Sequence, residues 1–467
     1  MPIKTLHITN AYHNASGGVR AFYRALIEAA NEQGRLMRLI VPGERDEVEE
    51  VGSYGRIYHV AARRAFLFDN RYRVLMPPTY LAPFRGKLWR ILRGELPDLI
   101  EVCDKYSVNW LGGLLRRGLI PGLRRPPLVG MSCERMDDNV RAFLGRNRAG
   151  RLWSRFHVGY CYIPFFDYHI ANSNYTAAEL RDAMRAGHER PVYVRPMGVE
   201  IDGLAQTRRS ESSRRKLIDE AGGGEGTKLL LYAGRLSPEK NVPLLIDMIE
   251  RLANDFILII AGDGPLAGFL ENEAKIRAPG RVRLLGHISE RAKLLHLYAD
   301  CDAFIHPNPR EPFGIAPLEA MATGLPLVAP NAGGVLSYAG ESNSWLAEPD
   351  GDSFAAAARA VFNDPAMRKD RLSTARWTAR QYEWRLVADS FFKLYDDLIE
   401  QFPSSRFASR NNRPAAFPVP PIKEEYEQPR CLESHASPGS HAGERRGRGY
   451  WSDPSNADSR TGSRNAS

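Results

Sequence analysis

The fold class can be predicted from one stretch, Asp302-Ala-Phe-Ile-His-Pro-Asn-Pro-Arg-Glu-Pro-Phe-Gly-Ile-Ala-Pro-Leu-Glu-Ala-Met-Ala-Thr-Gly-Leu-Pro-Leu-Val-Ala329. It begins with a short apolar strand at 303–306, which is followed by a Pro-rich loop and a helix from about Pro317 to Ala322. A second apolar strand follows Gly324-Leu-Pro. Strand, loop, helix and strand in this order are typical of an α/β fold.

The same stretch carries two acidic residues, Glu311 in the loop and Glu319 on the first turn of the helix. A loop that enters a helix N-terminus offers free backbone N–H groups and the positive end of the helix dipole. Two carboxylates there could bind hydroxyl groups beside an anion. They could equally be a solvated loop acid and a helix-capping acid, and the spacing alone leaves both interpretations open.

The composition favours two domains and a reducing compartment. A chain of 467 residues is long enough for two substantial cores. Its five cysteines are scattered, odd in number and without paired spacing, which argues against a disulfide framework or a zinc site. The N-terminus predicts a strand rather than a signal peptide, and no apolar run approaches the ~20 residues of a membrane span. We therefore expect a cytoplasmic protein, soluble or peripheral on the inner face of the plasma membrane.

The net charge of +9 is concentrated in one region, because residues 61–160 hold 19 Lys or Arg and only 8 Asp or Glu. Such asymmetry predicts an anionic partner or surface. Within this region Phe84, Leu88, Ile91 and Leu92 have helical spacing, with basic residues largely between them. This helix could lie on an anionic bilayer, or it could pack its apolar face on the sheet and leave its charges in solvent. No aromatic motif typical of nucleic-acid binding accompanies the charge, so we expect no nucleic-acid partner.

Two strand ends in the N-terminal half carry candidate binding residues. Gly17 and Gly18 lie at a strand-to-helix turn, where glycine allows a phosphate to approach the backbone, although a plain tight turn would need them as well. The strand at 127–132 runs into a polar cluster that begins with Cys133 and Glu134. Ligands of open α/β sheets bind at such carboxyl ends.

Local patterns give further expectations. Thr176 is the expected N-cap of a helix, with Glu179 at the capping-box position. Residues 210–226 are charged and Gly-rich and predict a poorly packed insertion. A last amphipathic helix is expected at about 377–402. Residues 403–467 contain 24 Ser, Pro or Gly and five Leu, Ile, Val, Met or Phe, which is typical of a disordered tail.

The C-terminal half contains a second phosphate-binding pattern. A strand that ends at Gly234 is followed by a short loop with Arg235 and Lys240. Two cations on one short loop suit a diphosphate.

Four motifs now carry a resemblance: Gly234-Arg-Leu-Ser-Pro-Glu-Lys240, Ala261-Gly-Asp-Gly-Pro265, Glu311-Pro-Phe-Gly-Ile-Ala-Pro-Leu-Glu319 and Ala329-Pro-Asn-Ala-Gly-Gly-Val335. In this order they resemble the retaining GT-B glycosyltransferases of family 4, the group of bacterial phosphatidylinositol mannosyltransferases. The resemblance covers about residues 1–402. It implies two Rossmann-like domains that face a cleft, an acceptor domain at 1–200 and a donor domain at 201–376. It also implies that a helix at 377–402 crosses back to the first domain.

The resemblance implies roles for residues of both halves. Arg235 and Lys240 would hold the donor diphosphate and stabilise the charge of the departing nucleotide, and Glu311 would contact hydroxyls of the transferred sugar. Glu319 would accept hydrogen bonds from the ribose. The remaining residues expected at the donor are Gly17, Gly18, Gly286, His287, Phe313, Gly314 and Ile315.

The implied reaction is the metal-independent transfer of a hexose from a UDP- or GDP-sugar, with no cofactor, to a lipid or saccharide hydroxyl. Same-face attack would retain the anomeric configuration, with the leaving phosphate accepting the acceptor's proton. One position departs from the family, since Cys133 stands where many relatives place a histidine that touches the donor sugar. Glu134, His157 or His169 could supply that contact.

Two alternatives remain open at this stage. The chain could be another GT-B enzyme, such as a sugar-phosphate glycoside synthase or a nucleotide-sugar epimerase. It could also be a catalytically silent GT-B protein that binds an anionic surface. Cys133 slightly favours the silent protein, whereas the intact Arg235, Lys240, Glu311 and Glu319 argue against it.

Overall fold

A computed structural model describes residues 2–13, 17–65, 73–76, 86–120, 125–144, 148–203 and 209–402. The predicted tail at 403–467 lies outside this range, as does Phe84. Among the described residues, no helix is both long enough and apolar enough to cross a membrane.

The N-terminal half is built on an eight-stranded sheet with the order β10-β9-β8-β7-β1-β2-β4-β3. Its neighbours pair in parallel, except that β3 runs antiparallel to β4. The strands are β1 (Lys4–Thr9), β2 (Leu36–Gly43), β3 (Glu47–Val51), β4 (Gly55–Ala61), β7 (Leu99–Cys103), β8 (Leu128–Ser132), β9 (Tyr168–Ala171) and β10 (Val192–Val194). A separate two-stranded ribbon pairs β5 (Arg63–Arg64) with β6 (Arg73–Val74).

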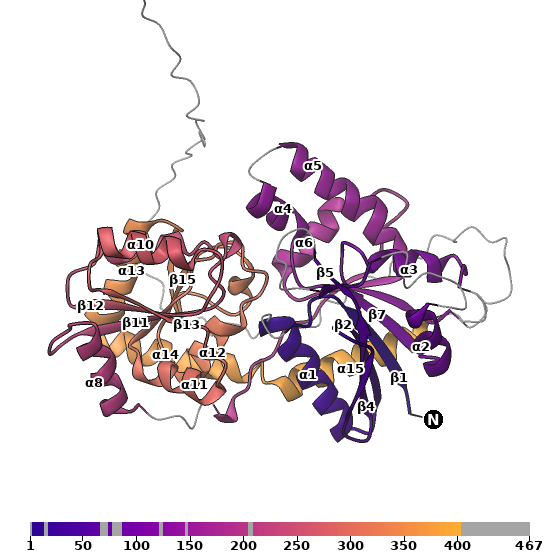
Figure 1. The fold of residues 1–467 in the computed structure, drawn as a ribbon, viewed down its shortest axis with the longest axis horizontal. Helices are drawn as coiled ribbons and strands as arrows, with labels where there is room; N and C mark the ends of the chain where they lie inside the picture. The colour runs from indigo at the N-terminus through magenta and orange to yellow at the C-terminus, as the bar shows by residue number, and fades with distance from the viewer. Residues whose placement is uncertain are drawn as a thin grey trace, which may run out of the picture. The chain divides into compact units, whose positions relative to one another are not determined.

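Helices connect these strands (Figure 1). They are α1 (Gly17–Glu32), α2 (Lys87–Glu95), α3 (Asn109–Arg116), α4 (Met136–Leu144), α5 (Arg148–His157), the π-helical η1 (Val158–Tyr162), the 3₁₀ turn η2 (Ile163–Phe165) and α6 (Asn174–Ala183). Side chains of α1 belong to one apolar core, and side chains of α2, α3 and α6 belong to another. The sheet is therefore covered by helices on both faces.

The C-terminal half has a six-stranded parallel sheet with the order β13-β12-β11-β14-β15-β16. The strands are β11 (Lys228–Ala233), β12 (Phe256–Ala261), β13 (Val282–Gly286), β14 (Ala303–Ile305), β15 (Leu327–Pro330) and β16 (Trp345–Ala347). Its helices and 3₁₀ turns are α8 (Glu211–Glu220), η3 (Pro238–Lys240), α9 (Pro243–Glu250), α10 (Ala267–Arg277), α11 (Arg291–Asp300), α12 (Ile315–Thr323), η4 (Gly334–Ser337), α13 (Gly351–Asn363) and α14 (Pro365–Arg380).

Side-chain alternation along β11 shows why this sheet needs two layers of helices. Leu229 and Leu231 pack into the core that contains α11, α12 and α14, whereas Leu230 and Tyr232 pack into the core with α9, α10 and α13. Successive side chains of a strand point to opposite faces, so a strand of continuous apolar residues must be buried on both. The α/β fold with two parallel-sheet halves is therefore confirmed, while the predicted domain boundaries at residues 200 and 376 stay predictions.

The last helix, α15 (Trp384–Gln401), packs on the N-terminal half, as predicted. Tyr395 donates a hydrogen bond of 2.7 Å to the carboxylate of Glu101, which lies fully buried on β7. Tyr23 of α1 donates to the same carboxylate at 2.9 Å, and His7 Nδ1 of β1 lies 2.9 Å from it. A buried carboxylate needs such partners, so Glu101 ties α15 to α1 and to the centre of the sheet.

The prediction of a poorly packed insertion at 210–226 was wrong, because residues 211–220 form α8. Ser210 caps this helix by accepting a hydrogen bond from the backbone of Ser213. Ile218 is buried, and Arg214 forms a 2.8 Å ion pair with Asp302 at the start of β14. Apolar packing of Ile218 and Leu217 and a long-range ion pair hold the helix, and the local charge pattern shows neither.

Two helix boundaries also differ from expectation. Ser173, not Thr176, is the N-cap of α6, and Thr176 occupies the third helical position of its capping box. The last helix begins at Trp384 rather than at 377, since α14 continues to Arg380 and a turn separates the two helices. Sequence patterns place such ends only to within a few residues.

Replacing Tyr395 by Phe tests the attachment of α15. The variant removes one hydrogen bond to a buried carboxylate while His7 and Tyr23 stay, so we expect a loss of roughly 2 kcal/mol in the free energy of unfolding. Urea titration of the full chain measures it. Tyr160→Phe, at a tyrosine that is 47% exposed, is the matched control and should change stability by less than about 0.5 kcal/mol. Equal stability of the two variants would show that the Glu101 contacts do not hold the helix.

Candidate active site

The loop between β14 and α12 presents Glu311 at the N-terminus of α12. Gly314, the residue before the helix, has a φ of 89°, a left-handed conformation that favours glycine. Among the described residues, no hydrogen bond satisfies the backbone N–H groups of Phe313, Gly314 and Ile315. The helix start therefore offers free donors to an anion or a hydroxyl.

Lys240 and Glu311, which lie 71 residues apart in the sequence, form an ion pair. The ammonium of Lys240 donates to both carboxylate oxygens of Glu311, at 2.9 and 2.8 Å. Asn241, which follows Lys240, adopts a left-handed conformation with a φ of 54° and donates a 3.0 Å hydrogen bond to the carbonyl of Pro307. This contact fixes the loop after β11 against the loop after β14, and the sequence analysis did not single out Asn241.

The electrostatics of Glu311 depend on this pair. The carboxyl is 7% exposed, and burial alone would raise its pKa. The charge of Lys240 outweighs burial and, together with a 3.1 Å hydrogen bond from Asn308, lowers the pKa to about 2. His306, 3.8 Å from Glu311, is buried, and burial lowers its pKa to about 4. At neutral pH the site therefore holds an ionised Glu311 beside a neutral imidazole.

Two glycines of the Ala329–Val335 motif hold the Glu311 loop in place. The N–H of Gly334 donates a 2.6 Å hydrogen bond to the carbonyl of Glu311. A Cβ on Gly334 would lie 1.9 Å from the carbonyl oxygen of Pro312, and a Cβ on Gly333 would lie 2.8 Å from that of Pro309. Only glycine permits this approach of two backbones.

Two glycines of the Ala261–Pro265 motif likewise hold the loop that carries Arg235 in place. A Cβ on Gly262 would lie 1.9 Å from the carbonyl oxygen of Gly234, and one on Gly264 would lie 2.4 Å from that of Leu236. Arg235 lies in this loop, one-third exposed, with a guanidinium nitrogen 3.6 Å from Glu239. Arg235 and Lys240 are therefore presented by one short, tightly packed loop.

Glu319 lies on α12 and is held by two residues that the sequence analysis missed. Arg291 of α11 forms a 2.7 Å ion pair with one carboxylate oxygen, and the hydroxyl of Tyr298 donates to the other at 2.9 Å. Burial raises the pKa of Glu319 in spite of Arg291. Each oxygen of a carboxylate can accept more than one hydrogen bond. The carboxylate of Glu319 can therefore accept a further hydrogen bond while it contacts Arg291 and Tyr298.

The glycine turn of the N-terminal half lies against this site. A Cβ on Gly18 would be 3.5 Å from the side chain of Ile315 at the start of α12, whereas one on Gly17 would meet nothing within 4 Å. Phe313 itself is 1% exposed and packs against Tyr338, so its side chain belongs to the core. Only the backbone of Phe313 can therefore bind a ligand.

The predicted base-pocket loop lies at the end of β13. The carbonyl of Gly286 accepts a 2.8 Å hydrogen bond from Gly262, and Gly286 has a φ of 70°. The next residue, His287, is exposed. The fold thus places this loop beside the Ala261–Pro265 turn, and its contact with a base stays a prediction.

Cys133 lies at the carboxyl end of β8. Its Sγ is 3.6 Å from Sγ of Cys103 on the neighbouring strand, and this contact, together with burial, raises the pKa of Cys133, so it is a neutral thiol. Next to it, the carboxylate of Glu134 accepts a 2.8 Å hydrogen bond from Asn139, and burial raises its pKa. His169 is fully buried against the carbonyl of Ile163, which suits a structural residue.

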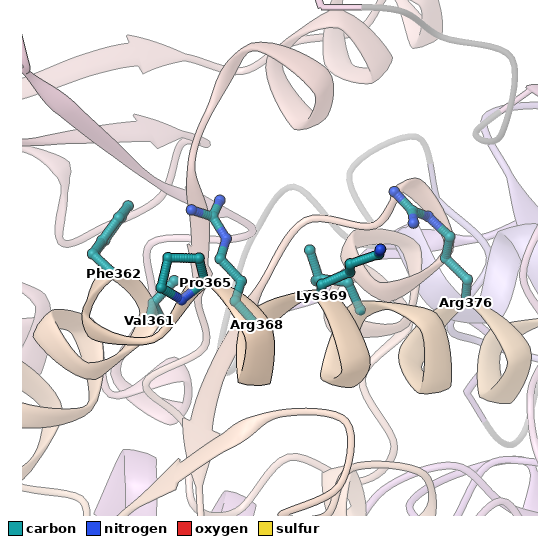
Figure 2. Close-up of a pocket in the computed structure, with 7 residues that line it drawn as sticks. Val361, Phe362, Pro365, Arg368, Lys369 and Arg376 are labelled. Carbon is teal, nitrogen blue, oxygen red and sulfur yellow. The ribbon is translucent and has the colours of Figure 1, made fainter.

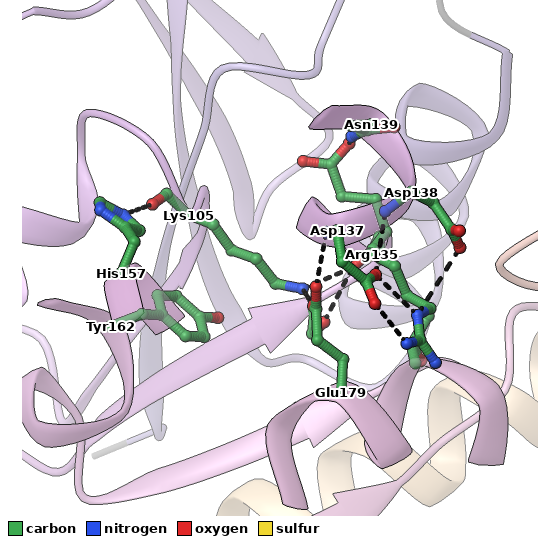
Figure 3. Close-up of polar contacts among 12 residues, drawn as sticks. Lys105, Arg135, Asp137, Asp138, Asn139, His157, Tyr162 and Glu179 are labelled. Atoms are coloured by element: carbon green, nitrogen blue, oxygen red, sulfur yellow. Dashed lines mark hydrogen bonds and ion pairs between the residues drawn. The ribbon is translucent and has the colours of Figure 1, made fainter. Parts of the chain in front are cut away.

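Figure 3 shows a network of polar contacts that includes Lys105, Arg135 and Glu179. Lys105 is almost fully buried, and its ammonium lies 2.5 Å from both the carbonyl of Glu134 and the carboxylate of Glu179. The Nε2 of His157 lies 2.7 Å from the carbonyl of Lys105. The predicted capping role of Glu179 was wrong, because this carboxylate instead neutralises a buried lysine.

Two residues close to this network, Ser173 and Asp138, contact the Glu311 loop. Ser173 donates a 2.5 Å hydrogen bond to the carbonyl of Pro312, and Arg310 lies 3.7 Å from Asp138. Cys133 and Glu134 therefore lie on the side of the N-terminal half that meets Glu311. Within the described residues no group of three or more His, Cys, Asp or Glu side chains could hold a metal ion, and we assign no metal ligand.

A pocket elsewhere in the C-terminal half contains none of the predicted site residues (Figure 2). It is lined by Val361, Phe362, Pro365, Arg368, Lys369, Leu372 and Arg376. Arg368 already lies over the ring of Phe362. We assign no role to this pocket.

Comparison with known proteins now identifies the family. Residues 16–202 match the model described as Glycosyltransferase Family 4, and residues 213–377 match the model described as Glycosyl transferases group 1. This chain is a family 4 glycosyltransferase.

Two relatives match over most of their length. A GDP-mannose-dependent alpha-(1-6)-phosphatidylinositol dimannoside mannosyltransferase of Mycobacterium tuberculosis is 28% identical over 83% of this chain and 94% of its own. A GDP-mannose-dependent alpha-mannosyltransferase of Corynebacterium glutamicum is 25% identical over 85% of this chain and 90% of its own.

Solved structures confirm the GT-B fold. Sucrose-phosphate synthase from Thermosynechococcus elongatus superposes with a TM-score of 0.67 at 18% identity, over 85% of this glycosyltransferase and 99% of that chain. The Anabaena protein HepE in complex with UDP-glucose has a TM-score of 0.61 at 19% identity, over 84% of this chain and 99% of its own.

Replacing Lys240 by Met tests the electrostatics of Glu311. Glu311 has a folded-state pKa of about 2, below its ordinary value of 4.5, so the pair stabilises the fold above about pH 4.5 and this contribution is lost as the pH falls toward 2. We expect the variant to lose roughly 2 kcal/mol of unfolding free energy at pH 7 and progressively less below pH 4.5. Urea titrations across this pH range measure the difference.

The control is Lys293→Met, at a lysine whose side chain is 72% exposed. It should change stability by less than about 0.5 kcal/mol at any of these pH values. A loss in Lys240→Met that stays constant from pH 7 to pH 3 would contradict the assigned pair.

Proposed function

We propose that this glycosyltransferase transfers mannose from GDP-mannose to a hydroxyl group of a lipid or saccharide, with retention of the anomeric configuration and without a metal ion. The observation that carries the proposal is the Lys240–Glu311 pair at the free N-terminus of α12. The choice of GDP-mannose is supported by two relatives, each named for dependence on this donor and each covering more than four-fifths of the chain.

Lys240 can serve both parts of the donor at once. An ammonium has three N–H donors, and two of them lie on the oxygens of Glu311. The third is available for an oxygen of the diphosphate, with Arg235 on the same loop as the second cation. Glu311 keeps lone pairs for the sugar hydroxyls. One lysine thus places the sugar-binding carboxylate next to the phosphate-binding cations.

In the proposed reaction, the bond between the anomeric carbon and the β-phosphate oxygen breaks and its electron pair stays on the phosphate. Arg235, Lys240 and the N–H groups at the start of α12 stabilise this developing charge. The acceptor oxygen forms the new bond on the same face, and its proton passes to the leaving phosphate. No pair of carboxylates on opposite faces of the sugar is needed, in contrast to glycosidases.

Other residues position the rest of the donor. Glu319, oriented by Arg291 and Tyr298, accepts hydrogen bonds from the ribose hydroxyls. Gly18, with Gly17 before it, lets the diphosphate approach the start of α1. Gly286 and His287 line the base. Cys133 cannot replace a strong hydrogen-bond donor, because a neutral thiol donates weakly, so we assign the neighbouring Glu134 to the acceptor side.

Substitution of the two central residues tests the proposal. Glu311→Gln and Lys240→Gln should each lower kcat/KM for mannose transfer from GDP-mannose by about 10² to 10³, because each removes a charge that acts on the donor. The assay follows radiolabelled mannose into an acceptor extract. Matched controls are Glu341→Gln and Lys293→Gln, at exposed positions, and they should transfer at the rate of the unaltered chain.

The same assay separates the alternatives. EDTA should leave the rate unchanged, and NMR of the product should show the anomeric configuration of the donor. Thermal shifts should be larger with GDP-mannose than with UDP- or ADP-sugars at the same concentration, since the stabilisation of the native state grows with the logarithm of the ligand's affinity. Binding of GDP-mannose without any transfer would favour the silent binding protein, and full activity of Glu311→Gln or Lys240→Gln would refute the assigned site.

A further inference from the structure

The helix α5 and the turn after it expose four large apolar side chains. Their exposed fractions are 67% for Leu152, 52% for Trp153, 55% for Phe156 and 47% for Tyr160. The spacing of 152, 156 and 160 puts three of them in one row. The rings of Phe156 and Tyr160 stack with their centroids 4.5 Å apart, so these two side chains form one apolar surface. A contiguous apolar patch of this kind on a protein surface usually marks an interaction site.

The opposite side of the same segment is anchored to the body of the N-terminal half. Ser154 and Val158 are buried. Gly159 packs so closely that a Cβ there would lie 2.6 Å from the carbonyl oxygen of Ala183 at the end of α6. The exposed row is therefore presented by a fixed helix.

Arginines flank the apolar row. Arg148, Arg151 and Arg155 lie on α5, and all three are exposed. The guanidinium of Arg185, from the segment after α6, lies 3.7 Å from the centre of the Tyr160 ring. No Asp or Glu occurs between residues 148 and 160, so the segment itself supplies no counter-charge.

The other basic amphipathic helix of this region does not offer such a face. Leu88, Ile91 and Leu92 of α2 are buried in the core of the N-terminal half. Of the two interpretations that the sequence left open for this helix, packing on the sheet is the correct one. Among the described helices of the basic region, α5 instead presents a row of exposed apolar side chains.

We propose that α5 and the turn to Tyr160 dock on an anionic lipid bilayer. Trp and Tyr favour the level of the headgroups, Leu and Phe favour the acyl boundary beneath it, and arginines are attracted to anionic headgroups. A second copy of the chain fits the surface less well. A two-fold contact through this row would bring the same arginines near one another, and four side chains supply far less than the ~800 Å² per partner of a stable interface.

The surface is also connected to the acceptor side of the active site. His157, the last residue of α5, contacts the carbonyl of Lys105, and the ammonium of Lys105 contacts the carbonyl of Glu134 (Figure 3). A bilayer docked on α5 would therefore bring lipid headgroups to the half of the protein that is proposed to hold the acceptor. This link rests on the proposed function, whereas bilayer binding itself can be measured without donor or acceptor.

Co-sedimentation of the full chain with vesicles tests the proposal. The vesicles are phosphatidylcholine alone or with about 30 mol% phosphatidylglycerol, to supply an anionic surface. The variants are Trp153→Ser with Phe156→Ser, and the triple variant Arg148→Gln, Arg151→Gln, Arg155→Gln. Matched controls away from α5 are Phe269→Ser with Trp377→Ser, and Arg215→Gln with Arg380→Gln and Arg385→Gln, all at exposed positions.

We expect the unaltered chain to bind the anionic vesicles and to bind the neutral ones much more weakly. The aromatic double variant should lower the partition coefficient at least about tenfold, since two apolar side chains no longer insert. The arginine triple variant should lower it on the order of a hundredfold at low salt, roughly a factor of five per arginine. Both control variants should bind like the unaltered chain. Unchanged unfolding midpoints would show that all four variants are folded.

Three results would overturn the proposal. The first is absence of binding of the unaltered chain to anionic vesicles, and the second is equal binding by the α5 variants and their controls. The third is a dimer in size-exclusion chromatography with light scattering that the aromatic double variant converts to a monomer without any vesicle binding. That result would assign the surface to a second copy of the chain. None of these results depends on sugar transfer, so each can be told apart from a failure of the proposed function.

Discussion

The ion pair between Lys240 and Glu311 joins the two loops on which the candidate site is built. Lys240 comes from the loop after β11 and Glu311 from the loop after β14, two neighbouring strands of the parallel sheet. Parallel strands bring their carboxyl ends to one edge, so residues far apart in sequence meet there. Because Glu311 is buried, it needs a cation, and because Lys240 has a third N–H, that cation can also serve an anionic ligand.

The glycines of two motifs allow the backbones of neighbouring loops to pack closely, which fixes the position of Lys240 and Glu311. Gly262 and Gly264 let the turn after β12 pack against the Arg235 loop, and Gly333 and Gly334 do the same for the Glu311 loop. A side chain at Gly262 or Gly334 would meet a carbonyl oxygen at 1.9 Å. The motifs of the C-terminal half thus contain residues of two kinds: charged side chains, and glycines that position the loops carrying them.

Much of the fold could be predicted from the sequence, because continuous apolar strands and intervening helices are local patterns. The sequence motifs also singled out Arg235, Lys240, Glu311 and Glu319, whose roles toward a donor stay predictions. What could not be predicted depends on distant partners. Arg291 and Tyr298 become important only because α11 packs beside Glu319, and Lys105 is buried only because Glu179 lies next to it. The helix α8 was missed for the same reason, since a long-range ion pair to Asp302 holds it. The basic region likewise showed its charge but not which of its helices leaves an apolar face exposed.

A crystal structure of the full chain with GDP-2-deoxy-2-fluoro-mannose, a slowly reacting donor, would show whether Lys240 contacts both Glu311 and the donor diphosphate. We predict that the ammonium of Lys240 lies within hydrogen-bond distance of both a Glu311 oxygen and a diphosphate oxygen. We also predict that Arg235 contacts the same diphosphate and that Glu311 accepts a hydrogen bond from the sugar. A diphosphate bound away from the Arg235 loop, or a sugar without contact to Glu311, would contradict the proposal.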